Sequence, residues 1–240
     1  MPLVDLNVDL GELPGEPAEL YSLATVVNVA CGGHAGDKAS MARALSFAMA
    51  RGARVAAHPS YPDRAGFGRV AMDLPPEEIA LAVEQQCAAL QAIARRIGYP
   101  VAIVKAHGAL YHEAAKSAAV ARALLDGAQR GLGTKEITVV GPPRGALLDE
   151  ALSRGLRHAR EGFADRSYRA DGSLVPRSER GALVVDVGAC TRQAIALAAT
   201  GTIETICVHA DTQGAVDIAA AVREALAQNG YLAGALSATR

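Results

Sequence analysis

The sequence predicts an α/β fold with a parallel sheet, either a closed, incomplete β/α barrel or an open, doubly wound sheet. Seven short runs rich in β-branched residues alternate with segments whose apolar residues recur at helical spacing. Repeated strand–helix units imply a parallel sheet, and half of the 240 residues are apolar, which suffices for a sizeable core. No linker, repeat or low-complexity segment divides the chain, so we expect a single domain over residues 1–240.

The expected strands are short and are separated by segments long enough to hold a helix each. They cover residues 3–8, 25–30, 54–58, 102–106, 137–140, 156–160 and 205–209. Asp37 is expected to cap a helix over residues 38–51, and Pro75 and Pro76 open the next helix, which runs to Ile97. The remaining expected helices cover residues 118–130, 146–154, 192–200 and 215–228.

One segment without a regular pattern stands out, at residues 161–181 (EGFADRSYRADGSLVPRSERG). It is polar and rich in turn-forming residues. A loop of this length within a compact domain is usually functional or disordered. We favour a functional loop here.

The charge balance excludes several classes of partner. The chain carries 24 basic and 25 acidic residues, and no charge run indicates nucleic acid or an anionic membrane as a partner. No apolar run reaches the 18 residues of a membrane span, and the first strand pattern follows the N-terminus with no signal peptide before it. The four cysteines are far apart and form no C-x-x-C motif, as expected for free thiols in a reducing compartment. We therefore expect a cytoplasmic protein.

The glycine-rich stretch VNVACGGHAGDKAS, residues 27–40, follows the second expected strand and opens a helix. It does not match a P-loop, because Asp37 separates the last glycine from Lys38 and no Ser or Thr follows directly. Asp37 would itself occupy the start of the helix as its cap. We interpret the stretch as a loop that presents His34 to a cleft.

Polar residues gather toward the carboxyl ends of the expected strands. Side chains alternate along a strand, so three pairs each share a face: Asn7 with Asp9, Lys105 with His107, and His209 with Asp211. His58 ends the third strand. β/α barrels build their active sites at this end, so we expect these side chains to form one polar site.

The residue pattern alone leaves the chemistry of this site open. The sequence has no G-x-S-x-G nucleophile elbow and no H-E-x-x-H zinc motif. Asp9 could hold a metal together with His34, His58 or His107 if the fold brings them together. Spacing does not show such a convergence, and we assign no metal ligands from it.

Six motifs in order along the chain resemble those of the LamB/YcsF family. They are DLNVDLGE, VNVACGGHAGD, AAHPSYPDRAGFGR, VKAHGALYH, EGFADRSYRADGSLVPR and ICVHAD. The family's characterised members are A subunits of bacterial 5-oxoprolinases. The resemblance implies a seven-stranded β/α barrel of the glycoside hydrolase/deacetylase type.

The resemblance also implies an activity: the hydrolysis of 5-oxo-L-proline (pyroglutamate) to L-glutamate, with ATP converted to ADP and phosphate. The implied cofactor is ATP, bound here or together with a partner, with Mg²⁺ as its counter-ion. The implied partners are two further subunits, PxpB-like and PxpC-like. Two alternatives stay open, a metal-dependent deacetylase or amidohydrolase and a non-catalytic subunit that delivers the substrate.

The family's polar residues are kept in this chain, while Val8 replaces a usual cysteine and the loop after Glu12 is shortened. As catalytic residues we predict Asp9, His58, Lys105 and His107. The lysine suits either the substrate carboxylate or a developing oxyanion, and the other three suit proton transfer. As substrate-binding residues we predict Asn7, His34, Glu161, Arg166, His209 and Asp211. Glu12, Asp165, Asp5, Asp37 and Asp63 are also kept, without an assigned role.

Overall fold

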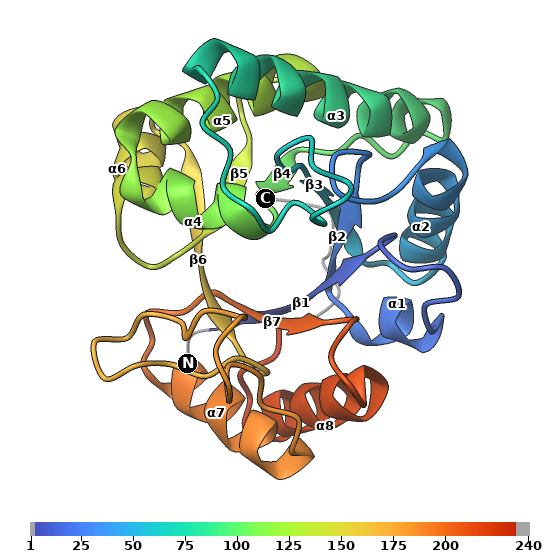
Figure 1. The fold of residues 1–240 in the computed structure, drawn as a ribbon. Helices are drawn as coiled ribbons and strands as arrows, with labels where there is room; N and C mark the ends of the chain where they lie inside the picture. The colour runs from blue at the N-terminus through green and yellow to red at the C-terminus, as the bar shows by residue number, and fades with distance from the viewer. Residues whose placement is uncertain (1–2, 234–240) are drawn as a thin grey trace.

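Seven parallel strands close into a barrel in the computed structural model, which describes residues 3–233 (Figure 1). The strands follow one another around the barrel in chain order, and β1 pairs with β2 on one side and with β7 on the other. Of the two architectures that the sequence predicts, the barrel is therefore the one observed. The strands are β1 Asp5–Leu10, β2 Val26–Ala30, β3 Arg54–His58, β4 Ile103–Lys105, β5 Thr138–Gly141, β6 Arg157–Phe163 and β7 Thr205–His209.

The helices form an outer ring around the strands (Figure 1). They are α1 Glu19–Leu23, α2 Lys38–Ala50, α3 Pro76–Arg96, α4 Gly108–Lys116, α5 Ala118–Leu132, α6 Ala146–Ser153, α7 Val187–Ala199 and α8 Ala215–Gln228. Asp37 caps α2 as predicted, and its side chain accepts a hydrogen bond from the Ser40 backbone amide at 2.8 Å. No helix within residues 3–233 is long and apolar enough to cross a membrane.

The apolar core lies between the barrel and its helices. Leu6, Val8 and Leu10 of β1 are fully buried in this layer, whereas Asn7 and Asp9 alternate with them and face the barrel interior. α3 and α5 pack closely on one another because Gly127 and Gly131 have no side chain. A Cβ atom at either glycine would overlap the backbone of α3.

The structure corrects several predicted boundaries. β6 continues to Phe163, so Glu161 lies within a strand rather than at the start of the loop. α7 begins at Val187 and not at residue 192, because the Asp186 side chain caps it by accepting from the Ala189 amide. The short helices α1 and α4 were not predicted.

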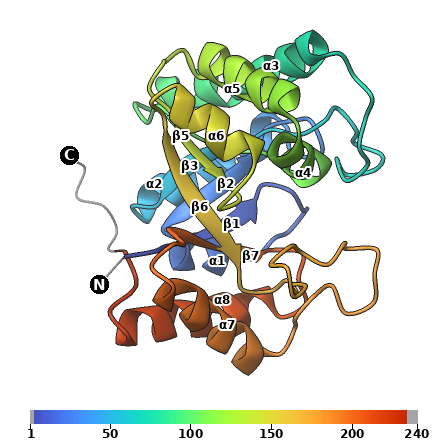
Figure 2. The ribbon, with the colours of Figure 1, turned by 90° about the vertical axis from the view of Figure 1, so that its left-hand side faces the viewer.

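Two long loops rise from the same end of the barrel (Figure 2). One follows β3 and covers residues 59–75, and the other follows β6 and covers residues 164–186. Because both follow the carboxyl ends of parallel strands, they border the end at which β/α barrels bind ligands.

Candidate functional site

A buried network around Lys105 fills the barrel interior. The Lys105 ammonium nitrogen lies 2.8 Å from Asp9 Oδ1 and 2.9 Å from Glu161 Oε1. It also donates to Asn7 Oδ1 at 3.2 Å and to Cys207 Sγ at 3.1 Å. Because β4 pairs only with β3 and β5 in the sheet, these contacts to β1, β6 and β7 cross the barrel interior.

Two asparagines hold the carboxylates of this network in place. Asn7 donates to Glu161 Oε1 at 3.1 Å and to Thr205 Oγ1 at 2.7 Å. Asn28 donates to Asp9 Oδ1 at 2.7 Å and to Asn7 Oδ1 at 2.7 Å. Buried charges are tolerated only when they are paired and hydrogen-bonded. Lys105 and Asp9 meet both conditions, whereas Glu161 Oε2 has no hydrogen-bond partner among residues 3–233.

The charges of this network are stabilised by one another. Burial acts to lower the pKa of Lys105, but Asp9, Cys207 and Glu161 together outweigh it, and the pKa lies well above its usual value. Burial acts to raise the pKa of Asp9, but His58 and Lys105 hold it well below its usual value. The lysine is therefore an ammonium and Asp9 a carboxylate at neutral pH.

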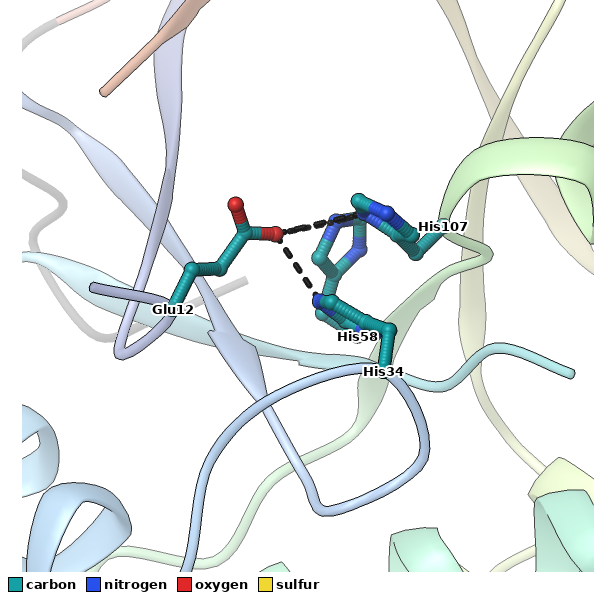
Figure 3. Close-up of side chains that lie close together, drawn as sticks. All are labelled: Glu12, His34, His58 and His107. Carbon is teal, nitrogen blue, oxygen red and sulfur yellow. Dashed lines mark hydrogen bonds and ion pairs between the residues drawn. The ribbon is translucent and has the colours of Figure 1, made fainter. Parts of the chain in front are cut away.

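A second group, which we call the histidine cluster, lies at the carboxyl ends of β1 to β4. It consists of Glu12, His34, His58 and His107 (Figure 3). Figure 3 shows the Glu12 carboxylate facing the three rings. Glu12 Oε1 lies 2.9 Å from His34 Nε2, 3.2 Å from His107 Nδ1 and 3.6 Å from His58 Nε2. All four side chains are almost completely buried.

Backbone carbonyl groups fix two of these rings. His58 Nδ1 lies 2.8 Å from the Lys105 carbonyl oxygen, and His107 Nε2 lies 3.0 Å from the Phe67 carbonyl oxygen. A carbonyl only accepts, so both of these nitrogens carry a hydrogen. Among residues 3–233, Phe67 is the non-glycine residue with a positive φ, 54°, a conformation that often marks functional sites.

Burial and neighbouring charges shift the pKa of these rings in different directions. Burial lowers the pKa of His34 to about 4 and also lowers that of His107. Burial acts in the same direction on His58, but the Asp9 carboxylate outweighs it and raises the pKa of His58. The cluster therefore holds imidazoles of unequal basicity around one carboxylate.

A third pair consists of Asp165, in the loop after β6, and His209, which faces Asp9 from the end of β7. The Asp165 carboxylate accepts from His209 Nδ1 at 2.9 Å, from the His209 amide at 2.9 Å and from Thr212 Oγ1 at 2.7 Å. Burial acts to raise the pKa of Asp165, but His209 outweighs it and the pKa is lowered. His209 is thereby oriented so that Nε2 points to Asp9, 3.9 Å from Oδ2.

A pocket of about 460 Å³ opens above these groups. Asp9, His58, Lys105, His107 and His209 lie at its base, and the loop after β6 contributes Leu174, Pro176, Arg177 and Ser178. Arg69, Arg166 and Arg177 give one side of the pocket a positive charge. The functional interpretation of the segment 161–181 agrees with this placement.

The structure brings most of the predicted site residues together. Those in the barrel interior, the histidine cluster or the pocket wall are Asn7, Asp9, His34, His58, Lys105, His107, Glu161, Arg166 and His209. Asp211 differs, because its carboxylate binds Arg69 at 2.5 Å and Arg177 at 2.9 Å at the rim of the pocket. It positions two arginines rather than facing the pocket itself.

Several residues of the site have no predicted role, among them Glu12, Asp165 and Cys207. Glu12 and Asp165 belong to two polar motifs of the sequence, D-L-G-E and A-D-R. These motifs were the sequence feature that could have indicated a role in the site. Their partners are far away in the chain. Only the closed barrel shows that Glu12 faces three histidines and that Asp165 orients His209.

Comparisons with known proteins agree on one family. The sequence model of the LamB/YcsF family matches residues 4–240. The A subunit of the 5-oxoprolinase from Streptomyces coelicolor is 44% identical over 98% of this chain and 100% of its own length. That from Mycobacterium marinum is 40% identical over 96% of this chain and 97% of its own.

Solved structures share the barrel. The lactam utilization protein from Thermus thermophilus superimposes with a TM-score of 0.89 at 35% identity, over 98% of this chain and 100% of its own. A family 4 carbohydrate esterase from Streptomyces lividans superimposes with a TM-score of 0.53 at 12% identity, over 97% of this chain and 92% of its own. The second likeness concerns the fold alone.

Proposed function

The chain belongs to the LamB/YcsF family, and on that premise we propose that it acts on 5-oxo-L-proline as the A subunit of a 5-oxoprolinase. The names of its relatives and of the lactam utilization protein support a hydrolase-related role in 5-oxoproline metabolism. In the proposed reaction, 5-oxo-L-proline, ATP and two molecules of water yield L-glutamate, ADP and phosphate. Opening the lactam adds the hydroxyl of water to the carbonyl carbon and delivers a proton to the ring nitrogen as the C–N bond breaks.

The observation that carries the proposal is the pair formed by Asp9 and His209 at the base of the pocket. Asp9 Oδ1 is held by Lys105 and Asn28. Asp9 Oδ2 lies 3.4 Å from His58 Nε2 and 3.9 Å from His209 Nε2. A carboxylate and an oriented imidazole at this separation can divide the work of a general base and a general acid. We propose that these two groups move the protons of the ring opening.

The lysine and the arginines supply the positive charge that the substrate requires. The Lys105 ammonium lines the base of the pocket, where it can stabilise negative charge that develops on the lactam oxygen. Arg166 and Arg177 line the wall, where a guanidinium can bind the substrate carboxylate in a bidentate manner. The pocket thus offers one cation for each end of a small anionic lactam.

We further propose that ATP and its Mg²⁺ bind with PxpB-like and PxpC-like partners rather than in this chain alone. The sequence has no P-loop, and Asp37 occupies the start of α2, where a phosphate would otherwise bind. ATP-derived activation would make the lactam carbon a better electrophile. The arginine side of the pocket suits a phosphorylated lactam as well as the free one.

The test is a reconstitution. The purified chain is assayed for glutamate and ADP release from 5-oxoproline and ATP, before and after addition of PxpB-like and PxpC-like proteins. We expect turnover only in the presence of the partners and its loss in His209→Gln. Undiminished turnover in His209→Gln would favour a subunit that only delivers substrate, and ATP-independent hydrolysis by the chain alone would favour an amidohydrolase.

A further inference from the structure

The histidine cluster contains a contact that two neutral imidazoles cannot make on their own. His107 Nδ1 lies 3.1 Å from His58 Nε2. The other nitrogen of each ring donates its hydrogen to a backbone carbonyl, that of Phe67 for His107 and that of Lys105 for His58. In the neutral tautomers, two lone pairs therefore face each other.

The Glu12 carboxylate adds negative charge to the same space. Its Oε1 atom lies 3.2 Å from His107 Nδ1 and 3.6 Å from His58 Nε2. It also lies 2.9 Å from His34 Nε2, and the His34 ring stacks on that of His107 with 3.6 Å between the ring centroids. Acceptor atoms that converge in a buried space require a cation between them.

The spacing of these atoms matches the ligand shell of a small transition metal. Zinc binds nitrogen and oxygen ligands at about 2.0–2.1 Å, so two ligands of a tetrahedral ion lie about 3.3 Å apart. Four of the six separations among the ligand atoms are 2.9, 3.1, 3.2 and 3.6 Å. One ligand atom from each residue lies within 4.8 Å of every other.

The surroundings of the rings also match a metal site. A histidine that binds a metal typically donates its second ring hydrogen to a carbonyl or a carboxylate, which fixes its orientation. The Lys105 and Phe67 carbonyl groups do this for His58 and His107. These contacts join β3 to β4 and the loop after β3 to the start of α4, so two of the four ligands, His58 and His107, have fixed rings.

A second group of metal-binding side chains lies nearby, formed by Asp9, Cys207 and His209. The Lys105 ammonium already contacts both Asp9 and Cys207, at 2.8 Å and 3.1 Å. The Lys105 ammonium therefore already supplies a positive charge to this group. No lysine or arginine among residues 3–233 forms an ion pair with Glu12, whose partners are the three histidines.

We propose that Glu12, His34, His58 and His107 bind one divalent transition metal ion, with zinc the best match to three imidazoles and one carboxylate. The proposal concerns binding and does not rest on the reaction proposed above. Soft or borderline ions suit imidazole ligands, whereas magnesium and calcium prefer shells of oxygen alone.

The experiment measures metal binding by the full chain, purified without a histidine tag. The protein is stripped with a chelator, and zinc binding is followed by titration calorimetry and by elemental analysis after gel filtration. We expect one zinc ion per chain and, with cobalt instead, the visible absorption of a tetrahedral ion. Glu12→Gln and His34→Gln should weaken zinc binding by roughly 100-fold or more, since even partners outside the ligand shell contribute about 10–100-fold.

Two variants serve as matched controls for binding. His112 also lines the pocket but lies outside the cluster, and Cys207 belongs to the group already paired with Lys105. His112→Gln and Cys207→Ser should each retain the zinc affinity. Failure of the unmutated chain to bind stoichiometric zinc, or undiminished binding in Glu12→Gln, would overturn the proposal, because a proton would then be the shared cation. If Glu12→Gln does not fold, the cobalt spectrum decides, and an octahedral spectrum counts against the site.

Discussion

Lys105 and Asp9 join two strands that are not neighbours. The ammonium nitrogen on β4 lies 2.8 Å from Asp9 Oδ1 on β1, and both side chains are almost completely buried. Glu161 contacts the same ammonium at 2.9 Å from β6. One ammonium therefore contacts carboxylates from two strands, β1 and β6, neither of which neighbours β4.

Replacing this lysine should destabilise the fold. Lys105→Met leaves Glu161 without a cationic partner among residues 3–233 and leaves Asp9 with histidine partners only. Breaking a buried pair in this way costs about 3–5 kcal/mol. The loss of stability should be smaller at low pH, because protonation of the buried carboxylates removes their unpaired charge. Chemical denaturation at neutral and acidic pH measures both effects. The exposed Lys116, which pairs with Glu113 at 3.1 Å, provides the control, and Lys116→Met should change stability by less than about 1 kcal/mol.

Asp9→Asn should abolish most of the activity of the reconstituted enzyme. It keeps the shape of the side chain and removes its charge and its capacity to accept a proton. General acid–base groups contribute about 10²–10⁴-fold, and we expect a loss of kcat in that range. Asp5→Asn is the matched control, since Asp5 begins the same strand and pairs with Arg54 at 2.5 Å, away from the pocket. Equal losses in both variants would show that the effect is structural.

Arg177→Gln should weaken substrate binding more than it slows the chemistry. Arg177 lines the pocket and is held by Asp211 at 2.9 Å. A hydrogen bond to a charged group contributes about 1.5–3 kcal/mol, so KM for 5-oxoproline should rise roughly 10- to 100-fold with little change in kcat. Arg180 is an exposed arginine of the same loop, and Arg180→Gln should leave KM unchanged. An unchanged KM in Arg177→Gln would place the substrate carboxylate elsewhere.

His158 should make the fold sensitive to acid. Burial lowers its pKa to about 4 from 6.5, and both ring nitrogens lack a partner among the described residues. Above pH 6.5 the ring is neutral in the folded and in the unfolded chain, so protonation of His158 takes nothing from the stability of the fold. As the pH falls toward 4, the unfolded chain takes up a proton that the folded chain refuses, so stability declines by up to about 3 kcal/mol.

The measurement for His158 is the change in melting temperature between neutral and mildly acidic buffer. His158→Leu removes the titrating group and should flatten this pH dependence, whatever its effect on stability at neutral pH. An equally steep acid loss in His158→Leu would assign the sensitivity to other groups.

The sequence predicted the barrel strands well where an apolar run ends at turn-forming residues, as in β3 and β7. It missed α4 because this helix starts directly after His107 and has no capping side chain. It ended β6 too early because Glu161 looks like a loop residue until its partner Lys105 is known. The polar residues at the strand ends predicted the location of the site, because parallel strands place their carboxyl ends together.

The pairing of residues within the site could not be read from the sequence. Glu12 meets its histidines, and Asp165 meets His209, only through the arrangement of strands around the barrel. Whether a polar residue faces the pocket also depends on neighbours distant in the chain. Asp211 illustrates this, because two arginines from different loops draw its carboxylate to the rim.

The barrel closes between its first and last strands, and this has a consequence for biosynthesis. Asn7 on β1 bonds to Thr205 on β7, 198 positions later, and Lys105 completes its contacts with Cys207 on the same strand. The ribosome releases β7 after all other strands. Until β7 is released, the chain lacks Thr205 and Cys207, so the barrel cannot close and its polar interior stays incomplete.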